Sequence, residues 1–276
     1  MASKAMARQP AVSGLFYPAE PEALRRQMKY LFEKAPRTRI TGTVRGVVAP
    51  HAGYVYSGVT AAAGYSLVRG RSFETVVVIS PSHREAFRGV SVYSGDAYET
   101  PLGTVRVDTA MRKELLCACP VAASTEVGHR EEHAVEVQLP FLQETLGDFM
   151  LLPIVMGEQD RSTCLELGRA LGEILEGKNA LVVASTDLSH YHSSRVAEAI
   201  ERVAIEDVRR FDFEQLMTDL ETGTTEACGG GPTVAMMAAL RKLGVNHMEV
   251  VHHCNSGDVT GDTRSVVGYL SAVAWS

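Results

Sequence analysis

Apolar positions along the chain form short, nearly continuous runs that alternate with segments of helical periodicity. The runs are rich in valine, isoleucine and leucine, which is typical of strands that are buried on both faces of a sheet. We therefore predict strands in these runs. They cover residues 44–50, 74–83, 149–157, 179–190, 247–256 and 265–275.

The segments between these runs repeat their apolar residues at helical spacing. The predicted helices cover residues 20–33, 56–70, 108–117, 133–146, 161–175, 193–211, 212–221 and 232–243. Alternating strands and helices indicate an α/β fold, with a mainly parallel or mixed central sheet covered on both faces, in three α/β/α layers. Residues 89–108 break the alternation and are predicted to form a hairpin or a strand insertion. Because no linker of Gly/Ser or Pro composition divides the chain, we expect one domain over residues 1–276.

Composition narrows the functional classes. The chain has 276 residues, 45% of them apolar, and a formal net charge of −6. These values favour a globular protein and argue against nucleic-acid or membrane-surface partners. The first nine residues lack the apolar core of a signal peptide, no apolar run approaches the roughly 20 residues of a membrane span, and the five cysteines are scattered. We therefore expect a cytoplasmic protein with reduced thiols and no membrane or nucleic-acid partner.

Polar side chains follow three of the predicted strands. His51 comes directly after the first run, His83 after the second, and Asp187 and His190 lie at the end of the run over 179–190. In open α/β sheets, binding sites form at the carboxyl ends of the strands. We therefore expect these side chains to share one site.

Cys228 stands in the stretch "TEACGGGPTVAMMAAL", directly before three glycines, Pro232 and an apolar helix. The amide groups and dipole of a helix N-terminus favour a thiolate, so this cysteine is a candidate metal ligand or nucleophile. Two neutral imidazoles are common metal ligands, and His51 and His83 are candidates for them. The glycines are interpreted as room for the close approach of metal and substrate, and Pro232 as part of the first helical turn.

Motifs along most of the chain together resemble the Memo family, also called AmmeMemoRadiSam system protein B. Each motif is weak by itself, but their joint presence in this order is specific. They are "RQPAVSGLFYP" (8–18), "VVAPHAGYVYSG" (47–58), "SPSH" (80–83), "TPLG" (100–103), "EHAVEVQLPFLQ" (132–143), "STDLSHY" (185–191), "ACGGGP" (227–232) and "NSGDVTGD" (255–262).

The resemblance implies a fold similar to the class III extradiol dioxygenases, which use non-haem iron. It implies that His51, His83 and Cys228 hold a metal, while Asp187, His190 and the "EH" histidine, His133, line the same pocket. Iron(II) is the metal that we expect first, and the soft thiolate keeps copper and zinc open. AMMECR1-like and radical-SAM proteins are the pathway partners that the resemblance suggests.

Three functional hypotheses follow. The first is an iron-dependent oxidoreductase acting on a small organic substrate, with His190 as acid or base and Asp187 as the residue that orients it. The second is a metal-free enzyme in which Cys228 is the nucleophile. The third is a non-enzymatic adaptor that binds metal or an acidic or phosphorylated peptide, since the family includes members described as signalling adaptors.

Two other clusters carry competing signals. "HREEH" (129–133) fits the inverted zinc-protease pattern, but its context predicts a charged loop rather than a helix. In "VHHCNS" (251–256), strand alternation places His252 and Cys254 on one face and His253 on the other, which favours a half-buried strand over a second metal site.

Overall fold

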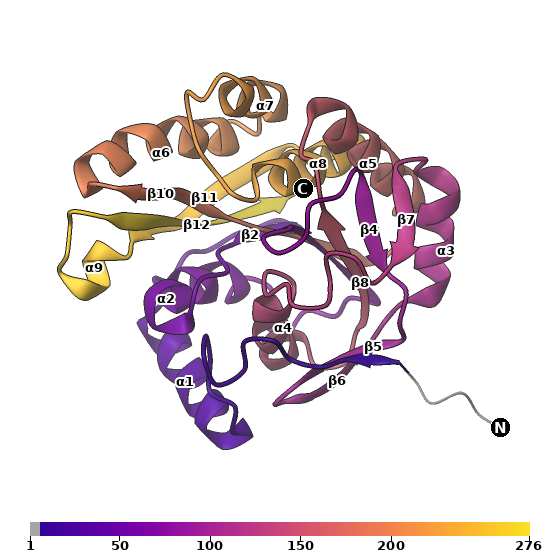
Figure 1. Cartoon of the computed structure of the whole chain (residues 1–276), viewed down its shortest axis with the longest axis horizontal. Helices are drawn as coiled ribbons and strands as arrows, with labels where there is room; N and C mark the ends of the chain where they lie inside the picture. The colour runs from indigo at the N-terminus through magenta and orange to yellow at the C-terminus, as the bar shows by residue number, and fades with distance from the viewer. Residues whose placement is uncertain (1–5) are drawn as a thin grey trace.

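A computed structural model describes residues 6–276, and residues 1–5, part of the N-terminal stretch compared above with signal peptides, lie outside the described part. A mixed sheet runs through the molecule (Figure 1). Its strands, in spatial order, are β10 (Asp187–His192), β12 (Val266–Trp275), β2 (Val44–Ala49), β9 (Ala180–Ser185), β3 (Thr75–Pro81), β8 (Met150–Met156), β4 (Val90–Tyr93) and β7 (Ala122–Thr125), with β11 (His247–Asn255) also paired to β12.

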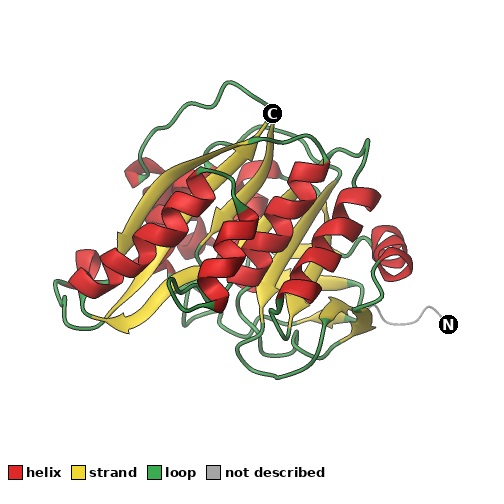
Figure 2. Cartoon of the chain, turned by 90° about the horizontal axis from the view of Figure 1, so that it is seen from above, coloured by secondary structure: helices red, strands yellow, loops and turns green. Residues whose placement is uncertain are grey.

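Helices cover both faces of this sheet (Figures 1 and 2). On one face lie α1 (Pro21–Lys34), α2 (Tyr54–Tyr65), the 3₁₀ turn η1 (Glu136–Gln138) and α4 (Leu139–Leu146). On the other lie α3 (Thr109–Ala118), α5 (Arg161–Ile174), α6 (Ser194–Arg209), α7 (Phe213–Glu221) and α8 (Gly230–Lys242). A short helix, α9 (Gly257–Thr260), follows β11.

The three layers follow from the side-chain alternation of the central strands. Along β3, Val76 and Val78 enter the core under α2 and α4, whereas Val77 and Ile79 enter the core under α5 and α8. Because successive side chains of a strand point to opposite faces, a continuous apolar run requires a covering layer on each side. The predicted central mixed sheet flanked by helices is therefore confirmed.

The predicted insertion over 89–108 divides between two sheets. Its first strand, β4, joins the main sheet between β8 and β7. The rest forms a hairpin of β5 (Ala97–Thr100) and β6 (Gly103–Arg106), and β5 also pairs with β1 (Ala7–Arg8) in a small three-stranded sheet.

The single strand predicted over 179–190 is wrong, because the chain leaves the parallel ladder at Thr186. The Thr186 N–H donates to the carbonyl of Ala49, and β10 then pairs antiparallel with β12. Register shifts occur along β10, where Tyr191 has a left-handed backbone with φ of 64°. As a result Asp187 begins a new strand instead of ending a long one.

The helix predicted over 133–146 is wrong at its start. His133 lies in a loop, and regular helix begins only at α4 after the 3₁₀ turn. The Glu132 carboxylate accepts the backbone N–H groups of His133 and Ala134, at 2.9 Å each, and so holds the chain outside a helix. The other predicted helices differ from the observed ones mainly at their ends, and the segment 56–70 forms α2 over Tyr54–Tyr65.

Within residues 6–276, none of the helices combines the length and apolarity that crossing a bilayer requires. The expectations of one domain and of a cytoplasmic location stay predictions.

Candidate metal centre

His51 follows β2 at the carboxyl edge of the sheet and is almost completely buried. Its backbone N–H donates to Asp187 Oδ1 at 2.9 Å, and its ring Nδ1 lies 2.9 Å from Ser185 Oγ. The Ser185 hydroxyl donates to the carbonyl of Ala134 and accepts from Gln138 Nε2. Since that hydroxyl has one hydrogen, Nδ1 of His51 must be the donor in the remaining contact. The lone pair of this neutral imidazole is therefore on Nε2.

His83 follows β3, and there a carboxylate faces the ring Nδ1. Its Nδ1 lies 2.9 Å from Glu132 Oε1, and its backbone N–H donates to Glu132 Oε2. Burial alone would raise the pKa of Glu132, but the hydrogen bonds and charge of His83 lower this pKa to about 2. An ionised Glu132 only accepts hydrogen bonds, so Nδ1 of His83 is the donor in this contact, and Nε2 is the ring nitrogen that remains to face a cation.

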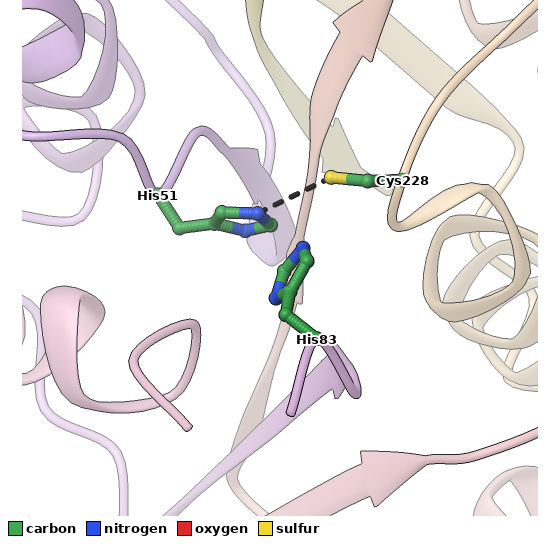
Figure 3. Close-up of side chains that lie close together, drawn as sticks. All are labelled: His51, His83 and Cys228. Atoms are coloured by element: carbon green, nitrogen blue, oxygen red, sulfur yellow. Dashed lines mark hydrogen bonds between the residues drawn. The ribbon is translucent and has the colours of Figure 1, made fainter. Parts of the chain in front are cut away.

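Cys228 reaches the same place from the loop between α7 and α8. Its backbone N–H donates to the carbonyl of Asp187 at 3.1 Å, and the Asp187 N–H donates to its Sγ at 3.3 Å. The Gln159 amide holds the loop from the other side by donating to the Cys228 carbonyl and accepting from the Gly231 N–H, at 2.8 Å each. Cys228 Sγ then lies 3.2 Å from His51 Nε2 (Figure 3).

The predicted residues His51, His83 and Cys228 therefore converge, although β9 separates the strands that precede the two histidines. One donor atom from each lies within 4.8 Å of the others. Donor atoms around one tetrahedral ion of zinc-like size are roughly 3.3–3.8 Å apart, so this spacing is of the right order. Two imidazoles and a thiol whose donor atoms face one another fit a divalent transition metal, and their spacing does not identify which one.

The thiol of Cys228 is not activated by the helix that follows it. Burial, and then the charge of Asp187, raise its pKa well above the usual range. The expectation that the helix N-terminus favours the thiolate is therefore wrong for the metal-free protein. A bound cation would deprotonate this thiol, because metal ligation displaces the proton.

A second group with metal-ligand chemistry consists of His83, Glu132 and His133. Here Glu132 accepts four hydrogen bonds, from both backbone and ring of His83 and from the N–H groups of His133 and Ala134. A carboxylate with its lone pairs engaged in this way holds the histidines in place rather than a cation. The group with Cys228 is therefore the stronger candidate for metal binding.

His133 lies against the imidazoles of His51 and His83, and its expected place in one pocket with Asp187 and His190 stays a prediction. Its ring centroid is 4.9 Å from that of His83 and 5.4 Å from that of His51, and Phe16 packs on its edge. Burial, and then the charge of His51, lower its pKa to about 4. Its Nδ1 has no hydrogen-bond partner within residues 6–276. His133 is therefore a neutral imidazole beside the ligands.

Asp187 and His190 occupy different surroundings on β10. Asp187 is buried, its Oδ2 lies 3.8 Å from His51 Nε2, and burial raises its pKa. His190 instead lines a cleft of about 460 Å³ together with Cys228. Cys228 thus stands where the imidazole cluster meets the cleft.

Several residues that sequence reasoning did not select hold this centre in place. Ser185, Gln138 and Gln159 position His51 and Cys228 through the contacts above. A buried Glu136 accepts hydrogen bonds from Arg8 and Tyr17, which anchors the N-terminal segment. All six lie within or beside the quoted motifs or next to a predicted strand, but only the fold reveals their partners.

The glycines after Cys228 have a different role from the predicted one. A Cβ on Gly229 would lie 2.1 Å from the Ser185 carbonyl oxygen, and one on Gly231 would lie 2.8 Å from the Gln159 side chain. They allow the turn to pack against neighbouring protein atoms, rather than leaving room for metal and substrate.

The two competing clusters behave as expected. Residues 129–133 form a loop, and His129 is buried with its ring bonded to Tyr98 and the carbonyl of Ser91. In β11, His252 and Cys254 both contact the Thr60 hydroxyl, whereas His253 contacts Glu201 on the opposite face.

Comparisons with known proteins agree with these motifs. The profile described as Memo-like protein matches residues 8–273. A MEMO1 family protein of Methanopyrus kandleri is 38% identical over 279 residues, covering 97% of this chain and 99% of that protein. One from Methanosarcina mazei is 39% identical over 269 residues, covering 96% and 98%.

A solved structure is also similar. An uncharacterized protein from Escherichia coli K12 has a TM-score of 0.52 and 15% identity, covering 85% of this chain and all of that one. This likeness concerns the fold alone, and the expected kinship with extradiol dioxygenases stays a prediction. The family profile and the relatives confirm the predicted family, and the chain belongs to the Memo-like proteins.

Proposed function

We propose that this protein is a metal-dependent enzyme, an iron(II) oxidoreductase that acts on a small organic substrate. His51, His83 and Cys228 are its proposed metal ligands. The observation that carries the proposal is the convergence of their donor atoms within 4.8 Å, with both imidazole Nδ1 atoms facing hydrogen-bond partners that leave Nε2 free.

Iron(II) held by His51, His83 and Cys228 would supply redox chemistry with dioxygen. The chain's own residues then divide the remaining work. His190 lines the cleft beside Cys228 and is the proposed acid or base. His133 offers a neutral imidazole beside His51 and His83, and Asp187 holds the His51 backbone in place.

The test is metal binding by anaerobically purified protein, reconstituted under reducing conditions and measured by elemental analysis. We expect about one iron per chain in the parent, and loss of most of it in Cys228→Ser and His51→Ala. Cys254→Ser and His252→Ala are matched controls, because these residues are also partly buried but contact only the Thr60 hydroxyl. They are expected to keep the metal.

A parent protein that binds no metal under these conditions would overturn the proposal. So would equal metal content in the Cys228→Ser and Cys254→Ser variants. Retention of copper or zinc in place of iron would preserve the ligand set and replace the proposed redox chemistry with that of the metal found.

The alternative hypotheses are weaker on specific grounds. A Cys228 nucleophile needs an accessible thiolate, and the raised pKa of this thiol opposes one in the metal-free protein. An adaptor that binds phosphorylated peptides needs a cationic pocket, whereas within residues 6–276 neither lysine nor arginine lines the cleft beside Cys228. Association with AMMECR1-like and radical-SAM proteins stays a prediction.

A further inference from the structure

The cleft beside Cys228 lies between α7, the start of α8 and β10. Its apolar walls come from Leu188, Met217, Leu220 and Ala227. Its volume of about 460 Å³ falls within the range of small-molecule sites. Such a surface favours a largely apolar ligand, because burying apolar area is the main favourable contribution.

The helix N-terminus at this cleft is closed to anions. The N–H of Gly229 donates to Thr186 Oγ1, that of Gly230 to the Ala227 carbonyl, and that of Gly231 to Gln159 Oε1. Pro232 has no N–H, and the next N–H group already bonds within the helix. The donors that usually bind a phosphate at such a turn are therefore engaged by the protein itself.

The other polar groups of the cleft are also engaged, with one exception. Thr225 donates to the Ile200 carbonyl, and the Gln159 amide holds the turn. The His190 ring makes no hydrogen bond to any residue of the described part of the chain. It is the polar side chain near Cys228 that is free for a ligand.

Charge at the outer rim is negative. Glu221 and Glu226 line the cleft and are each more than two-fifths exposed. Their partners, Arg161 at 2.6 Å and His192 at 3.0 Å, lie outside the lining. Among residues 6–276, neither lysine nor arginine lines the cleft. An anionic ligand would therefore meet two carboxylates whose partners lie outside the lining, with Arg161 offsetting part of the charge of Glu221.

We propose that this cleft binds a small, mainly apolar molecule that is neutral or cationic at its outer end and presents a hydrogen-bonding group to His190, and that it excludes carboxylates and phosphates. The identification of this molecule as a substrate rests on the proposed function. The charge preference of the cleft does not, since it depends only on the lining residues.

The test uses three probes of nearly equal shape: 2-phenylethylamine, 2-phenylethanol and phenylacetate. Binding is followed by NMR on protein labelled at its methionine methyl groups, with Met217 as the signal from the cleft. Met28, in the core on the other face of the sheet, is the internal control. We expect the amine to bind about fivefold more tightly than the alcohol, and phenylacetate at least about fivefold more weakly, as two rim carboxylates would impose.

Variants then locate the charge preference. Glu226→Gln and Glu221→Gln should each reduce the advantage of the amine about twofold and leave the alcohol unchanged. Glu249→Gln, an exposed carboxylate on β11 and outside the cleft lining, is the matched control. Tyramine adds a hydroxyl to 2-phenylethylamine, and its gain in affinity should disappear in His190→Ala.

Each experiment is run on chelator-treated and on metal-loaded protein, so that the two proposals fail separately. If the protein never binds metal, the proposed function is overturned. If this metal-free protein still prefers the amine, the cleft assignment is supported. Tighter binding of phenylacetate than of the amine by chelator-treated protein would overturn the cleft assignment. Absence of a Met217 shift with all three probes in the millimolar range would overturn it as well.

Discussion

Two clusters in this molecule contain the same types of side chain, histidine and cysteine, and differ in what surrounds them. In one, His51, His83 and Cys228 have donor atoms that face a common point. In the other, His252 and Cys254 both contact the Thr60 hydroxyl. In the first cluster, Nδ1 of each histidine hydrogen-bonds a residue outside the cluster, and the remaining donor atoms face one another. In the second cluster, both side chains hydrogen-bond the neighbouring Thr60 hydroxyl. Residue type alone therefore does not make a metal site, and the orientation of the donor atoms does.

The largest effect is expected from a methyl group added at Gly229, in the turn that follows Cys228. In Gly229→Ala the new Cβ would lie 2.1 Å from the Ser185 carbonyl oxygen, and the backbone there has little room to move. We expect loss of about 1–3 kcal/mol of unfolding free energy and of most of the bound metal. Urea denaturation and elemental analysis measure the two effects.

Gly268→Ala is the matched control near the second cluster, where the new Cβ would meet the Glu201 carboxylate at 1.9 Å. We expect destabilisation there with retention of the metal, because Glu201 contacts Ser189 and His253 and none of the proposed ligands. Equal metal loss in both glycine variants would show that general instability, not the Cys228 turn, controls binding.

An intermediate effect is expected from the carboxylates that contact a histidine in each region. Glu132→Gln removes the negative charge that faces His83 Nδ1, and metal affinity should fall about 10- to 100-fold. Glu201→Gln changes the corresponding contact of His253 and should leave affinity within about twofold of the parent. Competition with a chelator of known affinity measures both values.

The smallest expected effect is a change of fold stability with pH, which comes from the ionisation of Glu132 in the metal-free protein. Contacts with His83 hold its pKa at about 2, below the ordinary value of 4.5. A depressed pKa means that the carboxylate stabilises the fold above about pH 4.5 and that this contribution is lost as pH falls toward 2. The stability advantage of the parent over Glu132→Gln should therefore be constant above pH 5 and shrink at lower pH. Urea denaturation of both proteins from pH 3 to pH 7 measures this difference in unfolding free energy. A difference that grows on acidification would contradict the prediction.

The sequence by itself determined the layered architecture and most of its elements. The valine and isoleucine runs specify strands buried on both faces, and this signal is local, so strands such as β3 and β8 are recovered nearly to the residue. The same pattern placed His51 and His83 at strand ends. The motif around Cys228 made it a candidate ligand, and the family motifs supplied the rest of the proposed set.

Only the tertiary structure decided how these residues meet. It brought Cys228 to within 3.2 Å of a histidine 177 residues away, broke the predicted long strand at Thr186, and surrounded the thiol so that its pKa rises. It also placed Ser185 against Nδ1 of His51 and Glu132 against Nδ1 of His83. The physical reason is that periodicity is read from neighbouring residues, whereas desolvation and hydrogen-bond partners depend on groups that folding brings together from distant parts of the chain.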